Sequence, residues 1–100
     1  MSIIEENKDK IKALCGQHNV DSLFVFGSVL KKNFSASSDI DFLVDFKDVS
    51  LYDYADNYYN LKYELEALLK REIDLLENQA VRNPYLRESI ESSKQLLYGQ

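Results

Sequence analysis

The most constraining feature of this sequence is the stretch between residues 20 and 46, where two strand-like segments meet. The first segment, Val20 to Phe26, is rich in β-branched and aromatic residues and stops at Gly27-Ser28. Ten residues later, Asp39-Ile40-Asp41 opens a second apolar segment that runs to Phe46. Glycine lets the backbone turn sharply out of a strand and approach a ligand closely. The stretch therefore predicts two strands with a ligand site at their junction.

The two aspartates are spaced to act together on a cation. Alternate residues of a strand face the same side, so Asp39 and Asp41 present carboxylates about 6.5 Å apart along the chain, and Ile40 points to the opposite, buried face. Paired carboxylates of this kind suit one or two Mg²⁺ ions, such as those that assist phosphoryl and nucleotidyl transfer. The Asp-x-Asp pair alone is more often a solvated strand edge.

A third carboxylate is expected from a neighbouring strand over residues 72–76. Asp74 stands between apolar residues there, and Glu72 shares its parity and stays open as the alternative. Asp45 has the parity of Asp41, but four residues along a strand is about 13 Å, which is too far for the same metal pair.

The Gly27-Ser28 pair predicts a phosphate site. Ser28 can cap a short helix over Val29 to Lys32, whose free N–H groups would face an anion. A Gly-Ser pair alone is common in turns, so the prediction rests on the combination with the acids. An EF-hand loop is excluded because its sixth and twelfth positions, counted from Asp39, are Val44 and Ser50. A P-loop is excluded because the chain has no Gly-Lys-Ser/Thr.

The remaining pattern predicts an α/β (α+β) fold in the order α-β-α-β-α-β-α, a three-stranded mixed sheet with helices. Ser2 with Glu5 opens the first helix, which Gly16 is expected to end in the left-handed conformation. Ser50 with Asp53 opens a helix over 51–69. Its expected buried stripe is Leu51, Ala55, Tyr58, Leu61, Leu65 and Leu68. Asn83 and Pro84 start a last helix that is expected to reach about Tyr98.

Composition narrows the class of protein. One hundred residues, 45% of them hydrophobic, fit one domain spanning residues 1–100. The net charge of −5 argues against a groove that neutralises nucleic-acid phosphates. The lone Cys15 excludes a disulfide framework and a cysteine zinc cluster. No apolar run approaches the ~20 residues of a membrane span, and no signal peptide is recognisable, so a small cytoplasmic protein is expected.

Other side chains are expected to have structural roles. Five tyrosines fall between residues 52 and 63. We expect Tyr54 and Tyr58 to pack, while packing and a protein interface both stay open for the other three. Arg82 and Arg87 are expected to be solvated, and contact with a nucleotide or a partner stays open as the less favoured alternative.

The motifs together resemble the minimal nucleotidyltransferases, the MNT-type branch of the DNA polymerase beta-like superfamily. The matching segments are 26–28, 38–44 and 73–76, and the family core has about this length and element order. The resemblance implies that Asp39, Asp41 and Asp74 hold two Mg²⁺ ions, with Asp74 helping to activate the attacking hydroxyl, and that Gly27 and Ser28 hold the phosphates of ATP. Family members often carry arginine and glycine after Gly-Ser. Here Lys31 or Lys32 would supply the charge, without the bidentate fork of arginine.

The resemblance also implies a partner. Larger relatives carry a domain that holds the acceptor; residues 1–100 leave no room for one, so a second protein is expected to supply it. MNT-type proteins are commonly paired with a HEPN-domain toxin, on which the antitoxin can modify a tyrosine with AMP. The alternative is a non-catalytic antitoxin that neutralises its partner by masking, to which the altered 29–33 segment lends mild support.

Overall fold

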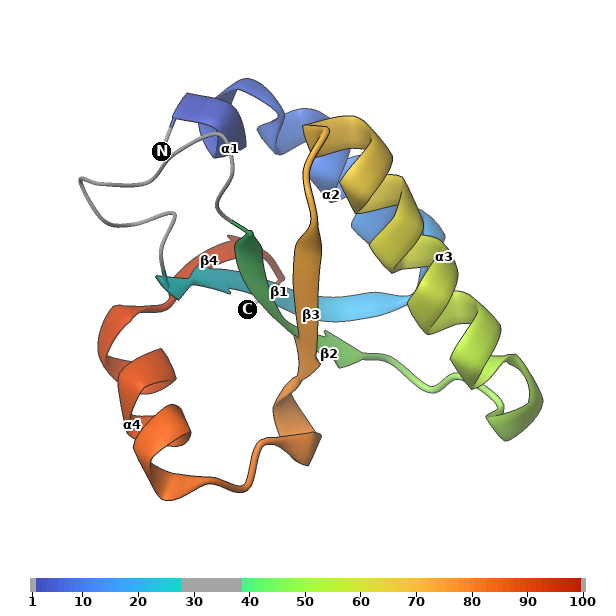
Figure 1. Cartoon of the computed structure of the whole chain (residues 1–100). Coiled ribbons are helices and arrows are strands. Elements are labelled where there is room, and N and C mark those ends of the chain that lie inside the picture. The colour runs from blue at the N-terminus through green and yellow to red at the C-terminus, as the bar shows by residue number, and fades with distance from the viewer. Residues whose placement is uncertain (1, 28–38, 100) are drawn as a thin grey trace.

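The computed structural model describes residues 2–27 and 39–99. Its elements are α1 (Ser2–Glu6), α2 (Lys8–Gln17), β1 (Val20–Phe26), β2 (Ile40–Phe46), α3 (Leu51–Leu69), β3 (Ile73–Glu77), the 3₁₀ turn η2 (Asn78–Ala80), α4 (Pro84–Ser93) and β4 (Gln95–Tyr98). Strand β2 pairs parallel with β3 and antiparallel with β1, and β1 pairs antiparallel with β4 (Figure 1). The predicted α/β class and mixed sheet are confirmed. The predicted number of strands is wrong, because the sheet has four in the order β3-β2-β1-β4.

The fourth strand occupies the end of the predicted last helix. Helix α4 begins as expected, with the Asn83 side chain accepting the N–H groups of Tyr85 and Leu86. The helix stops at Ser93, and residues 95–98 turn back along β1. Pairing with β4 satisfies backbone groups of β1 that would otherwise form an open edge, and it buries Leu97 at 6% exposure. These gains depend on contacts distant in sequence, so helical spacing alone could not reveal them.

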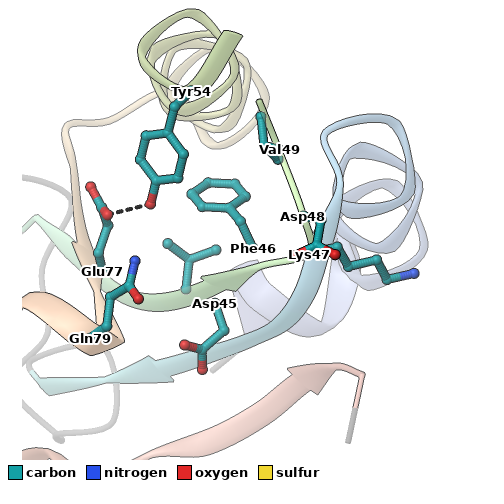
Figure 2. A pocket seen from close by; sticks show the side chains of 9 residues that line it. Asp45, Phe46, Lys47, Asp48, Val49, Tyr54, Glu77 and Gln79 are labelled. Atoms are coloured by element: carbon teal, nitrogen blue, oxygen red, sulfur yellow. Dashed lines mark hydrogen bonds between the residues drawn. The ribbon is translucent and has the colours of Figure 1, made fainter. Parts of the chain in front are cut away.

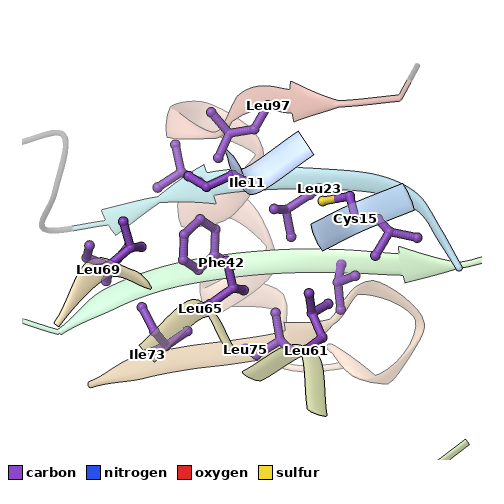
Figure 3. Close-up of a cluster of buried hydrophobic side chains, with 14 of the residues drawn as sticks. Ile11, Cys15, Leu23, Phe42, Leu61, Leu65, Leu69, Ile73, Leu75 and Leu97 are labelled. Carbon is purple, nitrogen blue, oxygen red and sulfur yellow. The ribbon is translucent and has the colours of Figure 1, made fainter. Parts of the chain in front are cut away.

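The sheet separates two apolar layers. Helices α2 and α3 cover one face, and α4 lies on the other (Figure 1). The larger core lies under α2 and α3, and its buried members include Ile11, Cys15, Leu23, Phe42, Leu61, Leu65, Leu69, Ile73, Leu75 and Leu97 (Figure 3). The smaller core joins Ile90 of α4 to Phe26 and Leu43. Burial raises the pKa of the Cys15 thiol to about 12, as expected for a packed cysteine rather than a reactive one.

Helix α3 has the predicted bounds, and the Ser50 side chain accepts the Asp53 N–H at its start. The predicted stripe is correct from Tyr58 onward and wrong before it, since Tyr58 packs against the main core. Leu61 and Leu65 are buried, but Leu51 is 92% exposed, Ala55 is exposed, and Leu69 is buried more deeply than Leu68. The start of α3 extends beyond the sheet (Figure 1), so Leu51 has no surface of the sheet to pack against. Apolar spacing marks a helix face but not where the sheet beneath it ends.

The tyrosines divide as expected. The hydroxyl of Tyr54 donates to Glu77, and that of Tyr58 donates to the Leu75 carbonyl oxygen at 2.5 Å. The other three tyrosines of this helix, Tyr52, Tyr59 and Tyr63, are exposed. Their side chains remain available for contact with another protein.

Among the described residues, no helix is both long and apolar enough to cross a membrane.

The N-terminal helix differs from the prediction at two points. It is split at Asn7, whose side-chain amide donates to the Ile3 carbonyl oxygen at 2.8 Å. Such a local bond competes with the helical ladder. Gly16 lies inside α2 and does not end it; the left-handed residue is Asn19, with φ of 58°. Asparagine tolerates this conformation better than most residues, so the turn has no need of a glycine.

The prediction that Arg87 is solvated is wrong. Its guanidinium donates to the Asn78 side-chain and backbone oxygens, both at 2.6 Å, and to the Val81 carbonyl oxygen at 3.2 Å. Asn78 in turn donates to Asp45 Oδ2 at 3.1 Å, and Ser22 Oγ donates to the same oxygen at 3.2 Å. This network ties α4 to the sheet, and it places Asp45 in a structural role apart from Asp39 and Asp41.

Replacing Arg87 with lysine is expected to lower the free energy of unfolding by about 1.5–3 kcal/mol, because an ammonium cannot reproduce the fork that reaches three acceptors. Urea denaturation followed by circular dichroism measures the change. The matched control is Arg82→Lys. Arg82 is exposed and makes no side-chain bond to the described part of the chain, so its change should stay within about 0.5 kcal/mol. Equal losses in both variants would contradict the role of the network.

Candidate active site

Two of the three predicted acids meet across neighbouring strands. In the parallel register of β2 and β3, Asp41 stands directly beside Asp74. Neighbouring strands lie about 4.8 Å apart, so both carboxylates emerge from adjacent positions on one sheet face. Asp39 precedes β2 by one residue, and Ile40 between the two aspartates is fully buried on the opposite face, as predicted. Asp41 is half-buried, and Asp39 and Asp74 are exposed.

Gly27 lies against the Asp41 carboxylate. Its φ is +79°, and a Cβ atom built on it would lie 2.3 Å from Asp41 Oδ2. Phe26, the residue before it, pairs with Asp41 across β1 and β2. Gly27 therefore has a backbone conformation that favours glycine, and its close approach is to a carboxylate of the same chain. Ser28, Lys31 and the expected helix over 29–32 lie outside the described residues.

The donor set suits a hard divalent cation. Three carboxylates offer the oxygen ligands that Mg²⁺ prefers, and a cation would offset the repulsion between Asp41 and Asp74. Within residues 2–27 and 39–99, however, no three His, Cys, Asp or Glu side chains converge into a preformed metal site. Asp39 and Asp74 are exposed and lie at the same end of the sheet as Asp41, so the chemistry of the set fits a divalent cation even though its convergence is incomplete.

Glu72, the alternative third acid, lies just before β3 and is exposed. Its backbone carbonyl oxygen accepts the Ile40 N–H at 3.2 Å, which begins the β2–β3 ladder. Glu72 is thus placed two residues from Asp74 at the same end of the sheet, but only Asp74 is paired in register with Asp41.

A cation on the same sheet face was not anticipated from the sequence. Lys94, just after α4, places its ammonium 4.5 Å from the centre of the Phe24 ring and 2.9 Å from Glu91 Oε1. The hydrogen bond and positive charge of Lys94, and then those of Arg87, lower the pKa of the Glu91 carboxyl. Phe24 and Phe26 alternate along β1 on the face that carries Asp41. Since Lys94 lies within the segment predicted to be helical to about residue 98, no sequence signal indicated that the helix ends before it.

A pocket of about 270 Å³ lies at the other end of β2, where the strand leads into α3 (Figure 2). Tyr54 and Glu77 face each other in it, joined by the hydrogen bond between them, and Phe46 packs edge-on against the Tyr54 ring. Burial and the neighbouring Glu77 carboxylate raise the pKa of Tyr54 to about 12. Asp45, at its rim, belongs to the Arg87 network, so the pocket is separate from the Asp41–Asp74 pair.

Comparison with known proteins decides the family. The model of the family described as polymerase beta, nucleotidyltransferase, matches residues 9–100. The chain belongs to this family. It is a nucleotidyltransferase, and the mixed sheet described above is the nucleotidyltransferase fold.

Relatives of similar length support the same family assignment. Two candidate protein adenylyltransferases of Methanocaldococcus jannaschii are 36% identical over 95 residues and 38% identical over 88 residues. The first alignment covers 91% of this chain and 94% of the relative, and the second covers 87% and 89%. The similarity therefore extends over nearly the whole of each protein.

Solved structures give the same fold. A candidate minimal nucleotidyltransferase superposes with a TM-score of 0.75 at 27% identity, covering 92% of this chain and 90% of that one. A toxin–antitoxin crystal structure with AMP-PNP gives a TM-score of 0.72 at 22% identity, covering 94% and 74%. The complex of a tri-AMPylated Shewanella oneidensis HEPN toxin with its MNT antitoxin gives 0.67 at 20% identity, covering 96% and 72%. The last two likenesses concern the fold alone.

Proposed function

We propose that this chain transfers AMP from ATP to a hydroxyl, a tyrosine hydroxyl of a HEPN-type toxin, and thereby acts as its antitoxin. The observation that carries the proposal is the alignment of Asp41 with Asp74 beside the turn at Gly27. The relatives described as candidate protein adenylyltransferases support the reaction class. The AMPylated HEPN toxin held by a protein of this fold supports a HEPN-type partner that is modified with AMP.

The residues divide between binding and reaction. Asp39, Asp41 and Asp74 would hold two Mg²⁺ ions, which supply charge neutralisation of the triphosphate and lower the pKa of the acceptor hydroxyl. Gly27, Ser28 and Lys31 would hold the phosphates. The acceptor oxygen forms a bond to the α-phosphorus, the bond from that phosphorus to the bridging oxygen breaks, and pyrophosphate leaves with its electron pair. Asp74 would help to activate the attacking hydroxyl by taking its proton.

The test is the mass of the partner. A HEPN-type toxin that binds this chain is purified alone, then incubated with the chain, ATP and Mg²⁺, and its intact mass is measured. We expect an increase by one or more AMP units. The variant Asp39→Asn/Asp41→Asn should bind the partner and transfer no AMP. Asp48→Asn is the matched control, because it removes an exposed carboxylate just beyond the other end of β2.

Two outcomes would contradict the proposal. Full transfer by Asp39→Asn/Asp41→Asn would remove these carboxylates from the reaction. Tight binding without any change of mass would favour the masking antitoxin instead.

A further inference from the structure

Strand β4 is an edge of the sheet on the side away from β2. It pairs with β1 along one side, through Leu23 with Tyr98, Phe24 with Leu96, and Val25 with Gln95. Among the described residues, no strand pairs with its other side (Figure 1). An edge strand presents unpaired backbone N–H and C=O groups, which form a template for an added strand.

A hollow of about 400 Å³ lies along this edge. It is lined by Lys8 and Lys12 of α2 and by the segment from Leu96 to Gly99. Leu96 is 45% exposed, whereas Leu97 is buried in the main core. The edge therefore offers an apolar side chain beside two ammonium groups, at a place where backbone pairing is also available.

The two lysines have no acidic partners within the described part of the chain. They stand one helical turn apart, so their side chains project from the same face of α2. No described carboxylate lies within 4.0 Å of either ammonium, although the protein as a whole is acidic, with a net charge of −5. Two ammonium groups that pair with no described carboxylate, at an open strand edge, are complementary in charge to the carboxylates of another molecule.

We propose that the β4 edge, with Lys8 and Lys12, binds an extended acidic segment of another protein as an added strand. Backbone pairing with β4 would supply affinity, alternate apolar side chains would contact Leu96, and the acidic ones would pair with the lysines. A second copy of this chain is the less fitting occupant. Its own edge strand, Gln95–Tyr98, carries no charged side chain that could meet the lysines. The inference is independent of nucleotidyl transfer.

A synthetic probe tests the surface on the whole chain. The probe is a blocked peptide of alternating glutamate and valine, titrated into the ¹⁵N-labelled protein while amide chemical shifts are recorded. We expect the largest shifts at residues 95–99 and at Lys8 and Lys12. The double variant Lys8→Glu/Lys12→Glu should bind at least about tenfold more weakly, and binding should weaken as salt rises. Glutamate at position 8 suits the first turn of α2, so this variant should fold.

Matched controls separate strand addition from simple charge attraction. Lys47→Glu/Lys62→Glu makes the same charge change away from the edge and should bind like the wild type. A peptide with the same glutamates but proline at alternate positions cannot donate the backbone bonds and should bind weakly. The proposal is overturned by an absence of binding at millimolar peptide, by equal binding of the proline peptide, or by equal weakening in both lysine pairs. A dimer in sedimentation that Leu96→Lys dissolves would also overturn it, since the occupant would then be a second copy.

Discussion

Replacing Gly27 with alanine is expected to lower AMP transfer at least about a hundredfold. The added Cβ would lie 2.3 Å from Asp41 Oδ2, a distance that no relaxed contact allows. Either the carboxylate moves or the backbone turn opens, and displacements of about 1 Å in a reacting constellation can reduce rates by two orders of magnitude. The strain of alanine at a φ of +79° adds only about 1–2 kcal/mol to the cost of folding. Initial rates of partner AMPylation measure the first effect, and urea denaturation measures the second.

Gly99→Ala provides a closely matched control. Gly99 also has a positive φ, +87°, and a Cβ there would lie 2.0 Å from the Asp21 carbonyl oxygen. This clash distorts the β1–β4 pairing far along β1 from Gly27, so it should destabilise the fold and leave the transfer rate of the folded protein near that of the wild type. Equal activity losses in the two variants, or full activity of Gly27→Ala, would contradict the direct role of Gly27 beside Asp41.

The elements predicted correctly are those whose signals are local. The Ser50–Asp53 and Asn83–Pro84 starts are set by side chains that bond the first N–H groups of their own helices. Strand β1 consists of a run rich in β-branched and aromatic residues, and it ends just before Gly27. Strand β4 has a sequence equally compatible with a helix, and only its pairing with β1 decides its conformation. The prediction for Arg87 is wrong for the same reason, since the oxygens that accept its hydrogen bonds belong to η2 and to the segment before α4.

The candidate site shows the same limit. Parity within a strand indicated which acids share a face, but the alignment of Asp41 with Asp74 depends on the β2–β3 register, which no single segment encodes. The approach of Gly27 to Asp41 likewise follows from pairing between β1 and β2. Sequence motifs thus predict the chemistry of this candidate site, while long-range pairing decides which carboxylates lie side by side. The choice between Asp74 and Glu72 is where this distinction can be measured.

Asp74→Asn is expected to lower the rate of AMP transfer about a hundredfold, in the range typical for the loss of a general base. Its partner in register is Asp41, so removing one charge also relieves repulsion, and the free energy of unfolding without Mg²⁺ should stay the same or rise by about 0.2–1 kcal/mol. Mg²⁺ should raise the melting temperature of the wild type and raise that of the variant less, because at a given concentration a ligand stabilises the fold more, the more tightly it binds. Transfer rates and thermal unfolding with and without Mg²⁺ measure these effects.

Glu72→Gln is the matched comparison, because Glu72 is an exposed acid of the same parity two residues away. Both substitutions remove one negative charge from the same end of the sheet, so any general effect on ATP attraction should be equal in the two. Only the loss of a carboxylate beside Asp41 should produce the large fall in rate and the smaller response to Mg²⁺. A large fall in Glu72→Gln with little change in Asp74→Asn would assign the third carboxylate to Glu72, and it would show that a side chain just outside β3 reaches the site without being paired in register.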